Sequence, residues 1–184
     1  MAPADVPMAS ASIPALPPEG RFTVLLGDAR DAGEPWHRTA VGLLESQGVE
    51  TVVPDTGRDA LDRLERAALG DAPRIHVAVL EQAMNDMTGL QVLRRLRERI
   101  AGAREAAAEA LGQADGVPPA ILLAHASDRG VSSGLMSDAL TIRVFSVLPR
   151  PVDTDQLLDT LARALQRRYA GRWPGAAERR KEEA

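Results

Sequence analysis

The sequence predicts an α/β domain of three layers, in which helices cover both faces of a five-stranded parallel sheet. Five short runs rich in Val, Ile and Leu alternate along the chain with longer segments of helical period. The short runs are almost continuously apolar, which is typical of parallel strands covered by helices on both faces. With 184 residues, the chain has enough length for one such domain and some residues to spare.

The first half of the domain alternates strands and helices, with a turn signal at two of the junctions. We expect strands over residues 22–26, 50–53 and 75–80, and helices over 34–47 and 58–69. Gly48 follows the first helix and Gly57 follows the second strand. Glycine readily ends a helix or forms a turn, so both positions support these boundaries.

The second half follows the same alternation and shows clearer helix signals. We expect helices over 88–113, 132–139 and 153–169 and strands over 120–124 and 142–148. The first of these helices begins at Thr88 and carries a stripe of apolar residues at helical spacing, namely Leu90, Leu93, Leu96 and Ile100. Asp153 with Gln156 has the spacing of a capping box, and Pro118 with Pro119 precedes the fourth strand.

Composition describes an acidic protein without cysteine. The chain has 22 Lys and Arg against 26 Asp and Glu, which gives a formal net charge of -4. This balance and an aromatic content of 3% argue against a nucleic-acid surface, so we expect no DNA partner. The absence of cysteine excludes disulfides and thiolate chemistry. The apolar runs are too short to cross a bilayer, and we expect a cytoplasmic protein with no membrane partner.

Three segments fall outside the alternating pattern. Residues 1–20 contain five prolines and no Lys or Arg, unlike a secretory signal, and we expect a disordered leader rich in Pro and Ala. Residues 171–184 mix both signs of charge, as a flexible solvated tail does. The domain itself then covers 21–170, with an extended third helix and an insertion near 98–118.

Charged side chains follow several of the predicted strands. Ligands of open parallel sheets bind at the carboxyl ends of the strands. There the first strand is followed by Gly27 and Asp28, the third by Glu81, the fourth by Ala124 with His125, and the fifth runs into Arg150. We therefore expect two acids and one arginine to face each other across this edge.

The segment 77–99 resembles the receiver domain of two-component response regulators, a flavodoxin-like family. The family places a Met three residues after its phosphoacceptor, then a Pro, and a Gly eight residues after the acceptor. Counted in this way, Glu81 stands at the acceptor, Met84 and Gly89 match, and Asn85 replaces the Pro. The segment 148–151, Leu-Pro-Arg-Pro, is similar to the Lys-Pro ending of the family's fifth strand.

The resemblance covers about residues 21–169 and implies the strand order 2-1-3-4-5 and a cis peptide bond before Pro151. It also implies a set of site residues: an acceptor Asp, an acid pair that helps to hold a divalent metal, a hydroxyl, a Lys and an aromatic switch residue. The equivalents in this sequence are Glu81, Gly27 with Asp28, Ala124, Arg150 and Val147. Among these equivalents, only Asp28 keeps the family's residue type.

These departures weaken the chemistry that the resemblance implies. Magnesium prefers carboxylate and phosphate oxygens, so Gly27 removes one potential ligand. We expect at most a weak magnesium site, with Asp28, Glu81 and Ala83 as its candidates, and no other cofactor. The side chain of Glu81 is one methylene longer than that of Asp, which displaces the carboxylate oxygen that would attack phosphorus. Phosphoryl transfer depends on accurate positioning of that oxygen.

The sequence therefore predicts a degenerate receiver, or pseudo-receiver, that is not an enzyme. The planar guanidinium of Arg150 suits a paired contact with a carboxylate, so we expect a standing ion pair between Glu81 and Arg150. Such a domain would signal in a bacterial two-component system or phosphorelay through contact with a signalling protein, either a histidine kinase or an effector, without being phosphorylated.

Two other functions stay open at this point. In the first, the domain is a competent receiver that accepts a phosphoryl group from a histidine kinase at the carboxylate of Glu81. In the second, it is an unrelated flavodoxin-like binding protein, although no glycine-rich phosphate motif supports nucleotide binding. Within the receiver interpretation, Asp86 is an alternative acceptor, displaced into the loop after the third strand.

Further residues could contribute outside this set. His37, His76 and His125 lack the spacing of metal ligands, and only His125 falls near the expected site. The apolar line of the third helix continues through Ile100 and Ala103 to Ala107 and Leu111, beyond the length that the sheet would cover. Either this extension forms a docking surface or a homodimer interface, or it is a flexible charged excursion, which Gly102 and Gly112 would favour.

Overall fold

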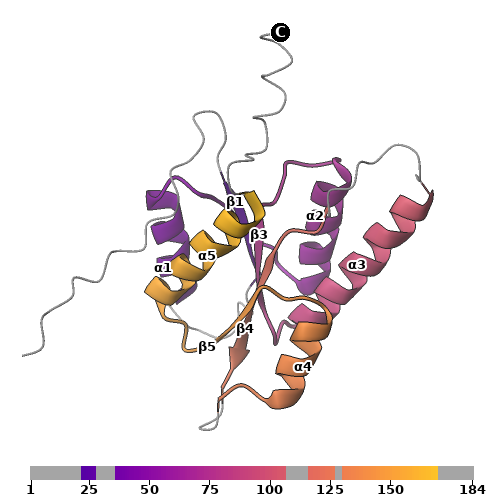
Figure 1. Cartoon of the computed structure of the whole chain (residues 1–184). Helices are drawn as coiled ribbons and strands as arrows, with labels where there is room; N and C mark the ends of the chain where they lie inside the picture. Colours follow the sequence, from indigo (N-terminus) through magenta and orange to yellow (C-terminus); the bar gives the residue numbers. More distant parts are fainter. Residues whose placement is uncertain (1–21, 28–35, 107–115, 127–129, 170–184) are drawn as a thin grey trace, which may run out of the picture.

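A computed structural model describes residues 22–27, 36–106, 116–126 and 130–169 of the chain. Strands and helices alternate without interruption along these residues (Figure 1). In chain order they are β1 (Thr23–Gly27), α1 (Trp36–Ser46), β2 (Glu50–Val52), α2 (Gly57–Leu69), β3 (Val77–Glu81), α3 (Gly89–Ala106), β4 (Ala120–His125), α4 (Ser133–Thr141), β5 (Ser146–Arg150) and α5 (Thr154–Tyr169).

The five strands form one parallel sheet in the order β2-β1-β3-β4-β5. The predicted class and strand order are therefore confirmed. Glu81 lies opposite Leu123, and His125 lies opposite Arg150. This register brings the ends of β3, β4 and β5 together at one edge of the sheet.

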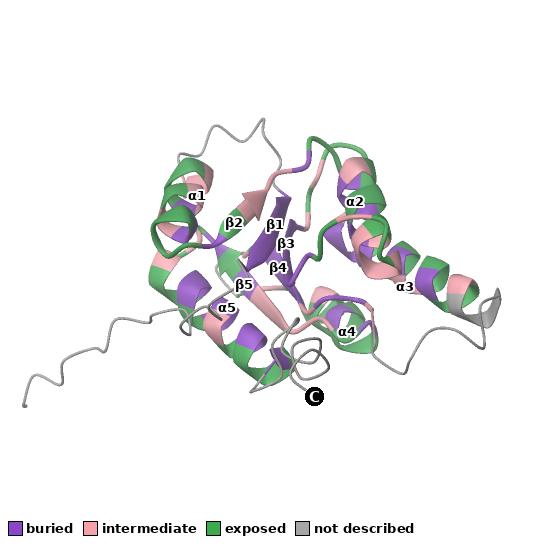
Figure 2. Ribbon diagram, turned by 90° about the horizontal axis from the view of Figure 1, so that it is seen from above, coloured by how far each residue is buried: buried purple, intermediate pink, exposed green. Residues whose placement is uncertain are grey.

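Helices cover the two faces of the sheet unequally (Figure 2). Helices α1 and α5 pack on one face, where the core includes Leu44 and Leu161. Helices α2, α3 and α4 pack on the other face, where the core includes Leu64, Leu96 and Ala139. Both faces of the central strands are consequently buried, which explains their continuous apolar runs.

The beginning of β5 differs from the prediction. The apolar run that starts at Ile142 suggested a strand, but α4 continues to Thr141 and the strand begins at Ser146. Arg143 has a left-handed φ of 52°, and the Val144 N–H donates to the Ala139 carbonyl. This is the geometry of a helix C-cap, which normally favours glycine, so the sequence carries no signal for it.

The predicted starts of α3 and α5 are confirmed by capping hydrogen bonds. The Gln91 N–H donates to Thr88 Oγ1, while the Thr88 N–H donates to Gln91 Oε1. The Gln156 N–H donates to Asp153 Oδ1 at 2.8 Å. Side chains thus satisfy backbone groups that have no partner within the helix.

Parts of the predicted organisation lie outside the described residues, namely the leader, the tail, and residues 107–113 of the third helix. Within α3, Ile100 is buried in the core and Ala103 is half-buried, so the apolar line is covered at least as far as Ile100. Across the residues that the structure describes, no helix combines the length and apolar character that crossing a bilayer requires.

Candidate functional site

A buried ion pair joins the ends of two strands at the carboxyl edge of the sheet. Glu81 is the last residue of β3 and Arg150 is the last residue of β5. The Nε and Nη2 atoms of Arg150 both lie against Glu81 Oε2. The two side chains are 2% and 3% exposed, so water does not separate their charges. The ion pair predicted from the sequence is present.

The alternation of side chains along the strands explains on which face of the sheet the ion pair lies, and an aromatic side chain covers it there. Successive side chains of a strand point to opposite faces, which places Glu81 on the same face as Val79, in the core beneath α1 and α5. On that face the guanidinium carbon of Arg150 lies 4.6 Å from the ring centroid of Trp36, at the start of α1. Trp36 therefore makes a cation–π contact that covers the pair.

Sequence reasoning missed Trp36. It is the first residue of α1 and belongs to none of the motifs that carry the family resemblance. In the sequence, a Trp at the start of the helix after the first strand does not indicate a role in the site. Its role becomes visible only in the structure, where α1 packs against the strand ends and brings the Trp36 ring to Arg150.

The remaining predicted site residues surround this pair without completing a reactive centre. Gly27 ends β1, and a Cβ there would lie 3.0 Å from Leu80 Cδ2, so a larger residue would crowd the neighbouring strand. Ala124 is 1% exposed on β4, and Val147 is half-buried on β5. Asp28 lies outside the described residues.

The described residues do not fit a magnesium site. Glu81 already contacts a guanidinium, Gly27 offers no carboxylate, and Ala83 is an exposed loop residue that pairs with Thr88 in an isolated bridge. No cluster of three His, Asp or Glu side chains that could hold a metal occurs among the residues described. The positive charge beside Glu81 comes from Arg150.

Close backbone approach explains the glycine eight residues after Glu81. A Cβ at Gly89 would lie 2.7 Å from the Glu81 carbonyl oxygen and 2.7 Å from Leu122 Cδ1. The first turn of α3 therefore packs against the end of β3 with no room for a side chain. This spacing holds Glu81 at the edge of the sheet.

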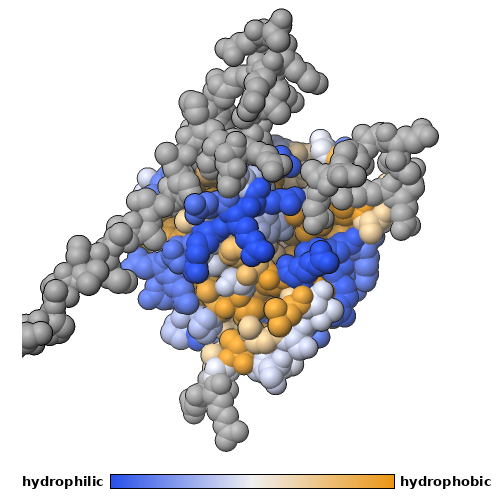
Figure 3. Space-filling model, viewed as in Figure 1, coloured by the Kyte–Doolittle hydropathy of each residue, from blue (hydrophilic) through white to orange (hydrophobic). Residues whose placement is uncertain are grey.

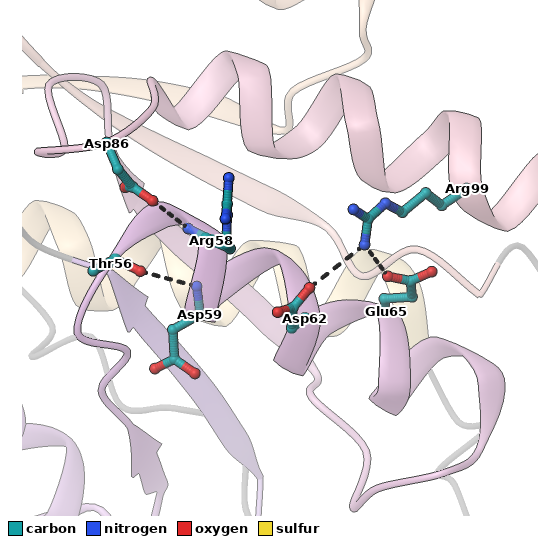
Figure 4. Close-up of polar contacts among 7 residues, drawn as sticks. All are labelled: Thr56, Arg58, Asp59, Asp62, Glu65, Asp86 and Arg99. Atoms are coloured by element: carbon teal, nitrogen blue, oxygen red, sulfur yellow. Dashed lines mark hydrogen bonds and ion pairs between the residues drawn. The ribbon is translucent and has the colours of Figure 1, made fainter.

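Asp86 has a structural partner. Its carboxylate accepts a hydrogen bond from the Gly57 N–H at 2.7 Å, at the start of α2. It also accepts one from the Arg58 N–H at 3.0 Å (Figure 4). Burial tends to raise the pKa of Asp86, but the hydrogen bonds from Arg58 and Gly57 outweigh it and lower the pKa below its usual value. Asp86 thus caps α2, which speaks against its role as a displaced acceptor.

The three histidines are dispersed, as their spacing indicated. His76 is buried between Phe22 and Tyr169, and its Nδ1 accepts a hydrogen bond from the Thr23 N–H. His37 lies on α1 with its ring edge-on to that of Trp36. His125 is exposed at the end of β4, beside Arg150 in the sheet. Only His125 neighbours the ion pair along the strand register.

Comparison with solved structures identifies the fold. A CheY-like response regulator receiver domain from Methanospirillum hungatei JF-1 matches with a TM-score of 0.60 and 16% identity, over 82% of this chain and 98% of that one. The chemotaxis protein CheY4 of Vibrio cholerae matches with a TM-score of 0.56 and 20% identity, over 79% of this chain and all of that one. The chain has the receiver-domain fold.

The Francisella response regulator 1452 receiver domain matches in the same way, with a TM-score of 0.57 and 20% identity over 80% of this chain and 98% of that one. No family model and no curated protein matches the sequence. The receiver-domain fold therefore occurs here at 16–20% sequence identity to the structures compared.

Proposed function

We propose that this chain is a receiver-type signalling module that works through protein contact and independently of phosphorylation. The observation that carries the proposal is the buried ion pair of Glu81 and Arg150, in which Glu81 is the residue that the resemblance aligns with the phosphoacceptor. The receiver-domain fold of the compared structures supports the signalling role.

Phosphorylation would require a free carboxylate oxygen in line with the donor. In that step a bond forms between the oxygen and phosphorus while the bond from phosphorus to the donor's leaving group breaks. Glu81 is 2% exposed, and its Oε2 already accepts both Arg150 contacts. An incoming phosphoryl group would have to enter a site that excludes water and would disturb a buried pair of charges, which is costly.

The same fold offers a surface for contact. On α4, Leu140 is 72% exposed and Met136 is 40% exposed, the two large apolar side chains that stand out among the described residues. The partner in this proposal is a signalling protein, a histidine kinase or an effector, that binds in the cytoplasm. A homodimer through the extended third helix belongs to the same proposal.

Incubation with acetyl phosphate and magnesium, followed by intact-mass measurement, tests phosphorylation independence. We expect no species heavier by one phosphate in the full chain, under conditions that phosphorylate a competent receiver run in parallel. A phosphate that appears in the wild-type chain and disappears in the Glu81→Gln variant would contradict the proposal and support a competent receiver.

A further inference from the structure

A cavity of about 420 Å³ opens at the other end of the sheet, near the amino-terminal ends of β4 and β5. Four arginines line it: Arg97 of α3, Arg143 of the turn before β5, and Arg167 and Arg168 of the last turn of α5. In Figure 3, strongly hydrophilic surface lies beside an apolar area on the face that carries α4 and α5. This cavity is distinct from the Glu81 site, which lies at the carboxyl ends of the strands.

Three of the four arginines of this cavity have no acidic partner among the described residues. The described lining itself contains no Asp or Glu, although the whole chain has a net charge of -4. Arg97, Arg143 and Arg167 form no salt bridge with any described residue, whereas Arg63, Arg99 and Arg163 each do. Arg97 Nε is also buried without a hydrogen-bond partner in the described part of the chain. A buried donor of this kind is costly unless a ligand or water satisfies it.

The backbone at Arg143 supports a role for its side chain. Its φ of 52° places a long side chain in a left-handed conformation that normally favours glycine. Glycine would therefore serve the helix C-cap at least as well as arginine. The backbone conformation therefore does not explain why this residue is an arginine, whereas the guanidinium that it contributes to the cavity does.

Apolar walls complete the cavity. Val117 and Pro118 are buried, and Pro119, Val144 and Phe145 are half-buried. Small-molecule sites typically combine such apolar walls with a few charged groups and enclose roughly 300–1,000 Å³. Guanidinium groups bind phosphate oxygens through paired hydrogen bonds, and several of them suit a ligand with more than one phosphate.

We propose that this cavity binds a nucleoside polyphosphate, with the arginines on the phosphates and the proline and phenylalanine walls on the base. In this arrangement side chains hold the phosphates. A glycine-rich loop, whose backbone N–H groups would otherwise hold them, is not needed and does not occur in the sequence. The site lies at the opposite end of the sheet from Glu81 and contains none of the residues of the ion pair.

Isothermal titration calorimetry on the full chain tests the proposal, with ATP, tripolyphosphate and adenosine as separate probes in the presence of EDTA. We expect ATP to bind, and tripolyphosphate to bind about tenfold more weakly because it lacks the base. Adenosine alone should bind more weakly still. No ATP binding, or equal affinities for ATP and tripolyphosphate, would overturn the proposal.

Three variants separate this site from general charge attraction. Arg97→Gln and Arg143→Gly should each weaken ATP binding about tenfold, the loss of one charge-assisted contact. Arg143→Gly should also keep or raise the thermal stability, because glycine suits its φ, so lost binding would not reflect misfolding. Arg163→Gln, on the exposed part of α5 and paired with Asp159, is the matched control and should bind ATP normally. Equal weakening by all three variants would overturn the proposal.

Discussion

The Glu81 and Arg150 side chains bring two opposite charges into a site almost free of water. Removing charges from water costs several kcal/mol per ion, and mutual attraction offsets that cost only when the partners are well placed. The two Arg150 nitrogens at one carboxylate oxygen and the Trp36 ring over the guanidinium supply that placement. Glu81 is therefore held as a structural anion.

A double-mutant cycle measures this interdependence. Glu81→Leu and Arg150→Met should each lower the free energy of unfolding by about 3 kcal/mol, because each leaves one buried charge without its partner. The double variant should lose less than either single variant. Urea denaturation provides the free energies.

The exposed pair of Asp159 and Arg163 on α5 is the control for that cycle, and its coupling should stay under about 0.5 kcal/mol. Additive losses in the Glu81 and Arg150 variants would show that the buried contact contributes nothing beyond the two separate side chains.

His76 gives the fold a dependence on pH. Burial, followed by the positive charge of Arg74, lowers the pKa of His76 from 6.5 to about 4. The hydrogen bond that Nδ1 accepts from the Thr23 N–H also needs an unprotonated ring. In the unfolded chain this imidazole takes up its proton near pH 6.5, whereas in the folded chain it stays neutral until about pH 4.

Stability should therefore be full above pH 6.5 and fall as the pH drops towards 4, by about 2–3 kcal/mol for this group. Urea denaturation between pH 7 and pH 4 measures the slope. His76→Gln should flatten it, whereas the exposed His125→Gln should leave it unchanged. A slope that survives in His76→Gln would assign the effect to other groups.

At the scale of elements, the start of α3 fixes the end of β3. Because Gly89 has no side chain, the start of α3 can lie close to the Glu81 carbonyl at the end of β3. Thr88 and Gln91 cap the helix at this point. The family-like spacing between Glu81 and Gly89 thus has a packing reason that is independent of phosphorylation.

Two alanine substitutions on α3 separate this contact from helix propensity. Gly89→Ala should destabilise the protein by about 1–3 kcal/mol, because its Cβ would overlap backbone and Leu122 atoms. Gly102→Ala, where no atom lies within 4 Å of the added Cβ, should stabilise it by about 0.5–1 kcal/mol. Thermal denaturation distinguishes the two, and destabilisation by both would contradict the packing explanation.

The elements also show where sequence reasoning reached its limit. Continuous apolar runs and capping residues predicted the sheet and the starts of α3 and α5, because those signals are local. The start of β5 was wrong because Ile142, Arg143 and Val144 complete the cap of α4, with arginine where glycine is usual. Trp36 was missed because its contact with Arg150 joins residues 114 positions apart.

For the molecule as a whole, the receiver-domain fold is shown, and the loss of phosphoryl transfer is our proposal. The sheet order, the glycine after β3 and the cis bond before Pro151 follow the resemblance. At Glu81, which the resemblance aligns with the phosphoacceptor, an arginine contacts the carboxylate. The ion pair could be predicted from the residue types, whereas its burial beneath α1 required the tertiary structure.

A magnesium titration followed by amide NMR tests most directly whether Glu81 is available to a metal or held by Arg150. We expect no saturable shifts at Glu81 or Ala83, because the guanidinium already neutralises the carboxylate. Saturable shifts confined to these residues and Asp28 would show a working metal site and would mean that Arg150 does not hold Glu81 out of reach of a metal.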